Sequence, residues 1–142
     1  MILRFESDGL ELIGRLSKPE KTAKGQTTAL ILCHGFPSLS TGDHDIAKSY
    51  YDLADLISEQ LGWTVFAITF RGCGSSQGNF SLQGWLNDII SATNYLVKEQ
   101  HIEKVKIDTN SKYIIPYKDW EIKQKALPVY EVPIEYCQYR LA

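Results

Sequence analysis

The sequence lacks the features of several protein classes. It has no run of 18 apolar residues, which excludes a helix long enough to span a membrane. Glu6 and Asp8 stand near the N-terminus where a secretory signal needs an apolar stretch, so we expect a cytoplasmic protein by default. The net charge of -2 at pH 7 argues against a nucleic-acid surface built on bulk positive charge.

Cysteine and histidine are scarce, with three of each. Cys33, Cys73 and Cys137 are far apart and odd in number, and the sequence contains no Cys-x-x-Cys pair and no metal-ligand spacing. We therefore expect reduced thiols, and the sequence implies no metal and no cofactor. The length of 142 residues makes one domain the default, and a hydrophobic content of 44% is sufficient for a buried core.

The most informative stretch that is present spans residues 28–37. Residues 28–33 are short and mostly apolar, which predicts a strand covered on both faces, as in a parallel sheet. His34 and Gly35 follow and predict a tight turn. Because open α/β sheets bind ligands at the carboxyl ends of their strands, residues 34–37 are the first candidate for chemistry. The alternative is that Gly35 only makes the turn and His34 only satisfies a local hydrogen bond.

The residues around this stretch predict alternating strands and helices. Asp8-Gly9 between apolar runs predicts a hairpin over residues 2–17. Residues 63–70 predict a second buried strand. The two expected helices carry their apolar faces at Ile46, Tyr50, Leu53, Ile57 and Leu61, and at Leu82, Trp85, Ile89, Thr93 and Leu96. This alternation predicts an α/β fold with a parallel sheet and crossover helices.

The composition changes near residue 104. Residues 105–107 alternate with charge, and Pro133 interrupts a later alternating segment, which suits an edge strand better than a central one. We therefore predict two parts: residues 1–104, and a partly β tail of unassigned structure over residues 105–142.

Four segments, taken together and in order, resemble the N-terminal part of an α/β-hydrolase of the serine aminopeptidase-like or monoacylglycerol-lipase-like branch. Residues 5–16 are similar to the opening hairpin of that family, and residues 30–37 to its third strand and oxyanion loop. Residues 70–78 resemble its Arg-Gly-x-Gly-x-Ser turn, and residues 85–89 the helix that follows. The resemblance implies the N-terminal half of the hydrolase sheet, with a tail that is not hydrolase-like.

The same resemblance implies roles for individual residues. The family hydrolyses esters or amides, and the backbone N–H of Phe36 would be one of two donors to the oxyanion. Gly35 would complete this oxyanion hole by letting the backbone approach the substrate. The residues of the structural motif would be His34, Arg71, Gly72 and Gly74.

The sequence departs from the family at the nucleophile. The family places its serine in a strained Gly-x-Ser-x-Gly turn after the fifth strand, and this pentapeptide does not occur in the chain. Ser111 is nearest in position, but Thr109 and Tyr113 stand where small residues are needed. The family order also requires a histidine after the serine. The histidines of this chain are His34, His44 and His101, which all precede Ser111. We therefore assign no catalytic residue.

The departure leaves several hypotheses. Residues 105–107 could pair with residues 28–33, but their alternation suits a strand with one wet face. We therefore expect residues 28–33 to form an exposed sheet edge to which a protein partner could bind. The first hypothesis is a hydrolase-family protein that is inactive alone and would take a small ester or amide only if completed. The others are a non-catalytic binding module, catalysis supplied in trans, and the product of a truncated or frame-shifted gene. Substrate and oligomeric state stay open.

Overall fold

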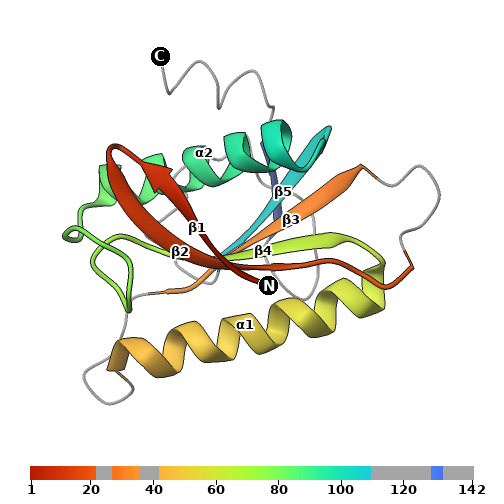
Figure 1. The fold of residues 1–142 in the computed structure, drawn as a ribbon, viewed down its shortest axis with the longest axis horizontal. Coiled ribbons are helices and arrows are strands. Elements are labelled where there is room, and N and C mark those ends of the chain that lie inside the picture. The colour runs from red at the N-terminus through yellow and green to blue at the C-terminus, as the bar shows by residue number, and fades with distance from the viewer. Residues whose placement is uncertain (22–26, 36–41, 110–128, 133–142) are drawn as a thin grey trace.

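The computed structural model describes residues 1–21, 27–35, 42–109 and 129–132; within these, residues 42–49, 109 and 129–132 are described by their backbone alone. The described residues form one six-stranded sheet in the order β1-β2-β4-β3-β5-β6, with a helix on each face (Figure 1). No described helix combines the length and the apolar character needed to cross a bilayer.

The chain begins with the predicted hairpin. Strands β1 (Ile2–Ser7) and β2 (Leu10–Ser17) are antiparallel and joined by two residues. Asp8 and Gly9 have φ angles of 52° and 77°, the left-handed conformation that a tight hairpin turn of the right twist requires. Aspartate tolerates this region and glycine favours it, so the Asp-Gly pair fixes the turn.

The centre of the sheet is parallel. Strand β3 (Thr28–Cys33) lies between β4 (Thr64–Thr69) and β5 (Lys104–Thr109) and pairs with both in parallel register. The expectation that residues 28–33 form an exposed edge is therefore wrong. β5 covers that edge, and β6 (Val129–Val132) pairs antiparallel on the far side of β5.

The alternation of β5 explains this error. Val105 and Ile107 are fully buried and pack into the core. Lys106 is only half-buried, and its Nζ lies 5.4 Å from the centre of the Trp63 ring. A lysine can bury its aliphatic stem against an aromatic ring while its charge stays near solvent. The charged residues of β5 are thus compatible with a position inside the sheet.

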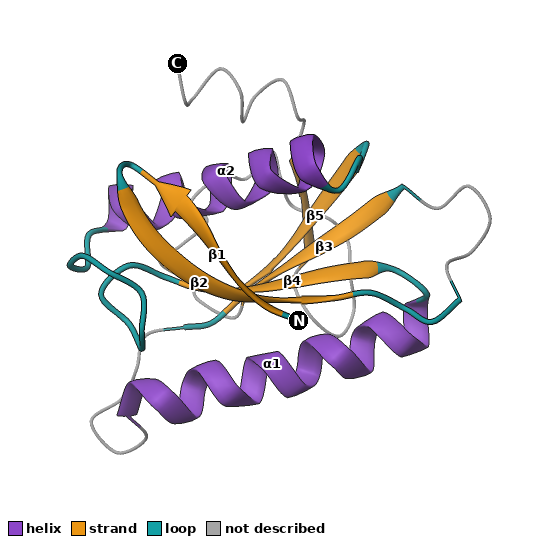
Figure 2. Ribbon diagram, viewed as in Figure 1, coloured by secondary structure: helices purple, strands orange, loops and turns teal. Residues whose placement is uncertain are grey.

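Two helices cover opposite faces of the sheet (Figure 2). Helix α1 (Gly42–Leu61) packs against β2, β3 and β4, and helix α2 (Leu82–Glu99) packs against β1 and β3. Ser81 caps α2, because its hydroxyl accepts a hydrogen bond from the N–H of Gly84 at 2.9 Å. Leu61 and Leu82 lie outside the buried faces to which the sequence analysis assigned them, with 49% and 44% of their surface exposed.

The architecture confirms the predicted fold class: a hairpin, then parallel strands with crossover helices, and a tail that contributes a strand. β5 begins at Lys104 and pairs with β3 in continuous register up to Thr109. The division of the chain at residue 104 stays a prediction from the sequence.

Candidate functional site

The candidate site lies at the carboxyl ends of β3, β4 and β5. Cys33, the last residue of β3, is in register with Ile68 of β4 on one side and with Thr109 of β5 on the other. The chain leaves β3 toward α1 and leaves β4 toward α2, and these helices lie on opposite faces (Figure 2). In α/β sheets, ligands bind outside the carboxyl ends of the strands where connections diverge in this way.

His34 follows β3 and is almost completely buried, with 1% of its surface exposed. Its Nε2 accepts a hydrogen bond from the N–H of Phe70 at 3.1 Å. Its Nδ1 therefore carries the proton and donates to the carbonyl oxygen of Gly35 at 2.7 Å. The Phe70 and Trp85 rings pack edge-on against the imidazole. These contacts tie the end of β3 to the end of β4 and occupy both ring nitrogens.

Gly35 is half-buried, and a Cβ added to it would meet no atom of the described residues within 4 Å. Its φ angle lies outside the left-handed region, so no backbone strain requires glycine here. The open space beside it agrees with a backbone that a ligand can approach. Phe36, the predicted oxyanion donor, lies outside the described residues.

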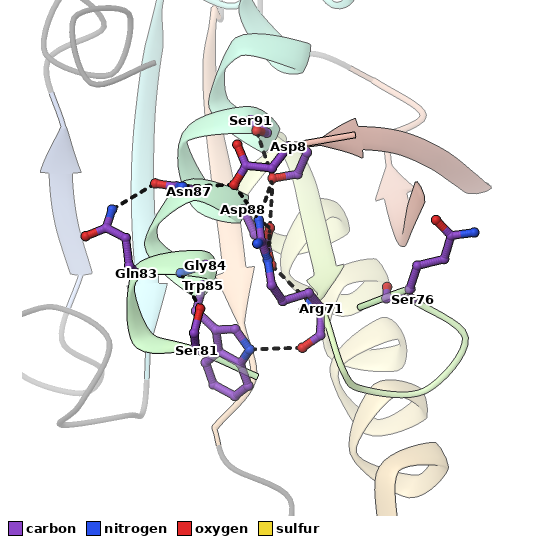
Figure 3. A network of polar contacts seen from close by, with 12 residues as sticks. Asp8, Arg71, Ser76, Ser81, Gln83, Gly84, Trp85, Asn87, Asp88 and Ser91 are labelled. Carbon is purple, nitrogen blue, oxygen red and sulfur yellow. Dashed lines mark hydrogen bonds and ion pairs between the residues drawn. The ribbon is translucent and has the colours of Figure 1, made fainter. Parts of the chain in front are cut away.

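Arg71 is the centre of a polar network that joins the hairpin to α2 (Figure 3). Its Nη2 lies 2.8 Å from Asp88 Oδ1 and 2.8 Å from Asp8 Oδ2, and its backbone N–H donates to Asp88 Oδ2 at 3.0 Å. The Ser7 hydroxyl donates to Asp88 Oδ1 at 2.7 Å. Asp88 is fully buried, and these donors compensate its charge.

The surroundings of Arg71 explain the spacing of the motif. Its carbonyl oxygen accepts a hydrogen bond from Trp85 Nε1 at 3.1 Å. A Cβ on Gly84 would lie 2.6 Å from Arg71 Cδ, so a glycine allows α2 to approach the arginine. The Asn87 amide donates to Asp8 at 2.9 Å, and this bond, followed by the bond from Arg71, lowers the pKa of Asp8.

The glycines of the turn after β4 have conformations that other residues rarely adopt. Gly72 and Gly74 have φ angles of 80° and 50°. A Cβ on Gly72 would lie 2.8 Å from the backbone nitrogen of Phe80. The Ser76 hydroxyl donates to the Thr69 carbonyl oxygen and accepts from the N–H of Ile13, so it holds the turn against the sheet.

Comparison with known proteins gives a result for the fold only. No family model and no curated protein matches the sequence. Among solved structures, an α/β serine hydrolase homologue from Coxiella burnetii matches with a TM-score of 0.61 at 18% identity, over 74% of this chain and 49% of that one. A serine hydrolase without a lid from Xanthomonas campestris matches with a TM-score of 0.58 at 22% identity, over 74% and 47%.

A third match is Est1E from Butyrivibrio proteoclasticus with ferulic acid bound, with a TM-score of 0.59 at 19% identity, over 78% of this chain and 43% of that one. The chain therefore spans about half the length of the structures it matches. It has the fold of the N-terminal part of an α/β-hydrolase.

In α/β-hydrolases the nucleophile turn connects a strand to a helix at the top of the sheet. The corresponding strand end here is that of β5, and it contains a residue that the sequence analysis overlooked. Asp108 is 3% exposed, and burial raises its pKa to about 6. In the described part of the chain, no hydrogen bond or ion pair joins its carboxylate to another residue.

Cys33 lies close to Asp108 in this hydrolase fold. Burial, followed by the negative charge of Asp108, raises the pKa of the Cys33 thiol well above its ordinary value. A thiol of this kind is a poor nucleophile, because the thiolate is the reactive form. Cys33 and Cys73 are both buried, and the described residues contain no cluster of His, Cys, Asp or Glu that could hold a metal.

The structure thus brings together only some of the predicted site residues. His34 and Gly35 lie at the strand ends, whereas Arg71, Gly72 and Gly74 build the neighbouring turn. Sequence reasoning missed that Asp88 is the partner of Arg71. Its position one helical turn after the buried Trp85 placed it on the inner face of α2, which is the signal that could have found it.

Proposed function

We propose that this chain belongs to the α/β-hydrolase family and presents the oxyanion half of an ester- or amide-cleaving site without a nucleophile, acid or base. The observation that carries the proposal is the position of His34 and Gly35, which follow β3 directly where it is flanked by the carboxyl ends of β4 and β5. His34 acts as a structural residue, because both of its ring nitrogens are held by backbone groups.

The oxyanion donor in this proposal is the backbone N–H of Phe36. It would stabilise the negative charge that develops on a substrate oxygen during acyl transfer, and loss of one such donor typically reduces the rate by about 10²–10³. Gly35 leaves open space next to this backbone. Small esters or amides are therefore the proposed ligand class, and a cytoplasmic location stays a prediction.

The proposed inactivity rests on the residues that would have to act on the substrate. Ser111 lies between Thr109 and Tyr113, which do not suit the strained turn. His101 precedes β5, so it lies near the amino end of that strand. Gly35 follows β3 and lies at the opposite, carboxyl end of the parallel strands. A serine without a nearby base is a weak nucleophile.

A test is the hydrolysis of p-nitrophenyl butyrate by the purified chain and by Phe36→Pro, which removes the proposed donor N–H. We expect both proteins to show the rate of the buffer blank. A wild-type rate well above that of the variant would contradict the proposed inactivity. The same result would support the backbone N–H of Phe36 as a donor. Circular dichroism of both proteins controls for folding.

The sequence also left open a binding module at the edge formed by residues 28–33, but β5 occupies that edge in the structure. Catalysis in trans would need strands from another chain, and β6 already pairs with the outer edge of β5. Strands supplied by another chain would have to displace β6 to extend the sheet at this point.

A further inference from the structure

Strand β1 presents a regular strand edge on the other side of the sheet. Met1 and Leu16 exchange both of their backbone hydrogen bonds, at 2.8 and 2.9 Å. Because bonded and non-bonded pairs alternate in an antiparallel ladder, the N–H and C=O groups of Arg4 and Glu6 point away from β2. Within the described ranges, β1 is the end strand and no other strand pairs with these groups.

Apart from the charges of Arg4 and Glu6, this edge lacks the usual protections against pairing. The register between β1 and β2 is continuous from Ile2 to Ser7, so β1 contains no bulge, and it contains no proline and no lysine. Ile2 exposes 48% of its surface near the start of the strand. A regular edge of this kind is a template for another strand.

Two hollows flank the middle of the edge. One has a volume of about 250 Å³ and is lined by Arg4, Glu6 and Glu11 among others. The other has a volume of about 280 Å³ and lies against α2, next to Asn94 and Lys98. Both include Phe5 and Glu6. A strand added here would direct successive side chains to opposite faces, so it would reach both hollows.

Asn94 supplies an independent sign that a group is missing at this place. It is 7% exposed and lines the hollow against α2. Its Nδ2 is the buried side-chain atom of the described residues that has no hydrogen-bond partner. A buried donor without a partner destabilises the fold, so an acceptor from outside the described residues would be stabilising.

We propose that the edge of β1 binds the β1 strand of a second copy of this chain, in antiparallel orientation about a two-fold axis at Phe5. Outward-facing groups can pair only with outward-facing groups, so Arg4 lies opposite Glu6 of the second copy and Glu6 opposite its Arg4. This register forms two pairs of opposite charge by symmetry. A shift by one pair would instead place the two Arg4 side chains opposite each other.

The same register explains the position of Asn94. Residues directly opposite each other in an antiparallel pair share a face, so the two α2 helices lie on the same face of the joined sheet. The hollow of each copy, with its Asn94 amide, then borders the seam between the copies.

Charge reversal tests this pairing. Sedimentation velocity over about 1 to 200 μM is expected to show a dimer fraction that rises with concentration. Arg4→Glu or Glu6→Arg alone puts like charges opposite each other and should weaken association at least roughly tenfold, because both symmetric pairs are lost. The double variant restores opposite charges and should recover association. Lys21→Glu, an exposed reversal away from β1, should leave it unchanged.

Two further measurements guard against misfolding and against a different interface. Glu6→Pro removes an outward N–H without breaking the β1–β2 ladder, so it should dissociate the dimer while circular dichroism keeps its wild-type form. Hydrogen exchange at Arg4 and Glu6 should slow as the concentration rises. The proposal is overturned by a monomer at all concentrations, by a dimer that ignores both reversals, or by exchange protection independent of concentration.

Discussion

Asp88 and Asp108 are both buried carboxylates, and their surroundings differ completely. Asp88 is 0% exposed and accepts hydrogen bonds from the Arg71 guanidinium, the Arg71 backbone N–H and the Ser7 hydroxyl. Asp108 is 3% exposed, and its pKa is raised to about 6 by burial without an offsetting cation in the described residues. The first site is built around its charge, and the second carries a charge that its surroundings do not stabilise.

The two carboxylates belong to different parts of the chain. The Arg71 network connects three segments that resemble the hydrolase family: the opening hairpin, the turn after β4 and helix α2 (Figure 3). Asp108 belongs to β5, just before the position where the family pattern fails. Local consistency between polar groups and their environment is expected in a sequence selected for its fold. By this criterion, the part of the chain in which polar groups match their environment ends before the end of β5.

Of the substitutions at these two sites, removal of Arg71 should change the stability of the fold most. Arg71→Ala leaves Asp88 buried without its cation, which typically destabilises a protein by about 3–5 kcal/mol. Urea unfolding followed by tryptophan fluorescence measures the loss. Arg15→Ala is the matched control, because Arg15 pairs with Asp55 at the partly exposed surface, where such pairs contribute about 0–1 kcal/mol. Equal effects of the two variants would contradict the account.

Replacement of Asp108 should stabilise the fold, whereas removal of Arg71 should destabilise it. Its folded-state pKa is raised from 3.8 to about 6, so the ionised form destabilises the fold, and stability present below pH 3.8 is lost as the pH rises through 6. Asp108→Val should therefore gain stability over wild type between pH 4 and pH 7.5, by about 3 kcal/mol.

Asp8→Asn is the control for this pH dependence. The pKa of Asp8 is lowered, so its contribution is present at neutral pH and is lost as the pH falls. The stability difference between wild type and Asp8→Asn should thus shrink toward low pH. A flat difference for Asp108→Val across the same range would show that Asp108 is not destabilising when ionised.

Alanine substitutions of Gly72, in the turn after β4, and of Gly35, after the end of β3, should differ in their effect on stability by a smaller amount. Gly72→Ala forces a side chain into a φ of 80° and to 2.8 Å from a backbone nitrogen, which should cost about 1–3 kcal/mol. Gly35→Ala places its Cβ in open space and should change stability by less than about 0.5 kcal/mol. Thermal unfolding of both variants distinguishes these outcomes, and a reversed order would be inconsistent with the structure.

Most of the fold could be predicted from local signals. The Asp8-Gly9 pair, the apolar run of residues 28–33 and the Ser81 cap each have one dominant structural solution. The helix faces were predicted less well at their ends. Leu61 and Leu82 continue the helical period but lie beyond the sheet, so periodicity alone assigns them to a face that has nothing left to cover.

The contact between α1 and the sheet shows a second limit. Ala54 and Ser58 are among its most buried residues, at 0% and 1% exposed, although neither is large and apolar. Small residues allow the helix to approach the strands closely, which a search for large apolar side chains does not detect. The Ser58 hydroxyl is satisfied by the Trp63 carbonyl oxygen at 2.7 Å.

The candidate site was predictable in position and not in composition. The motif residues His34 and Arg71 stand at or next to strand ends, as the pattern indicated. Their partners come from segments far away in the sequence: Asp88 lies 17 residues after Arg71, and the Phe70 N–H lies 36 residues after His34. Such pairings depend on the sheet order, which one sequence does not specify.

The most direct test of the central claim is intact-mass analysis after incubation with a fluorophosphonate, which phosphonylates activated serines. We predict no adduct on the folded chain at neutral pH, because Ser111 does not stand in a Gly-x-Ser-x-Gly sequence and the histidines of this chain all precede it. A single adduct that maps to Ser111 and is lost on unfolding would contradict the account, since it would demonstrate an activated nucleophile.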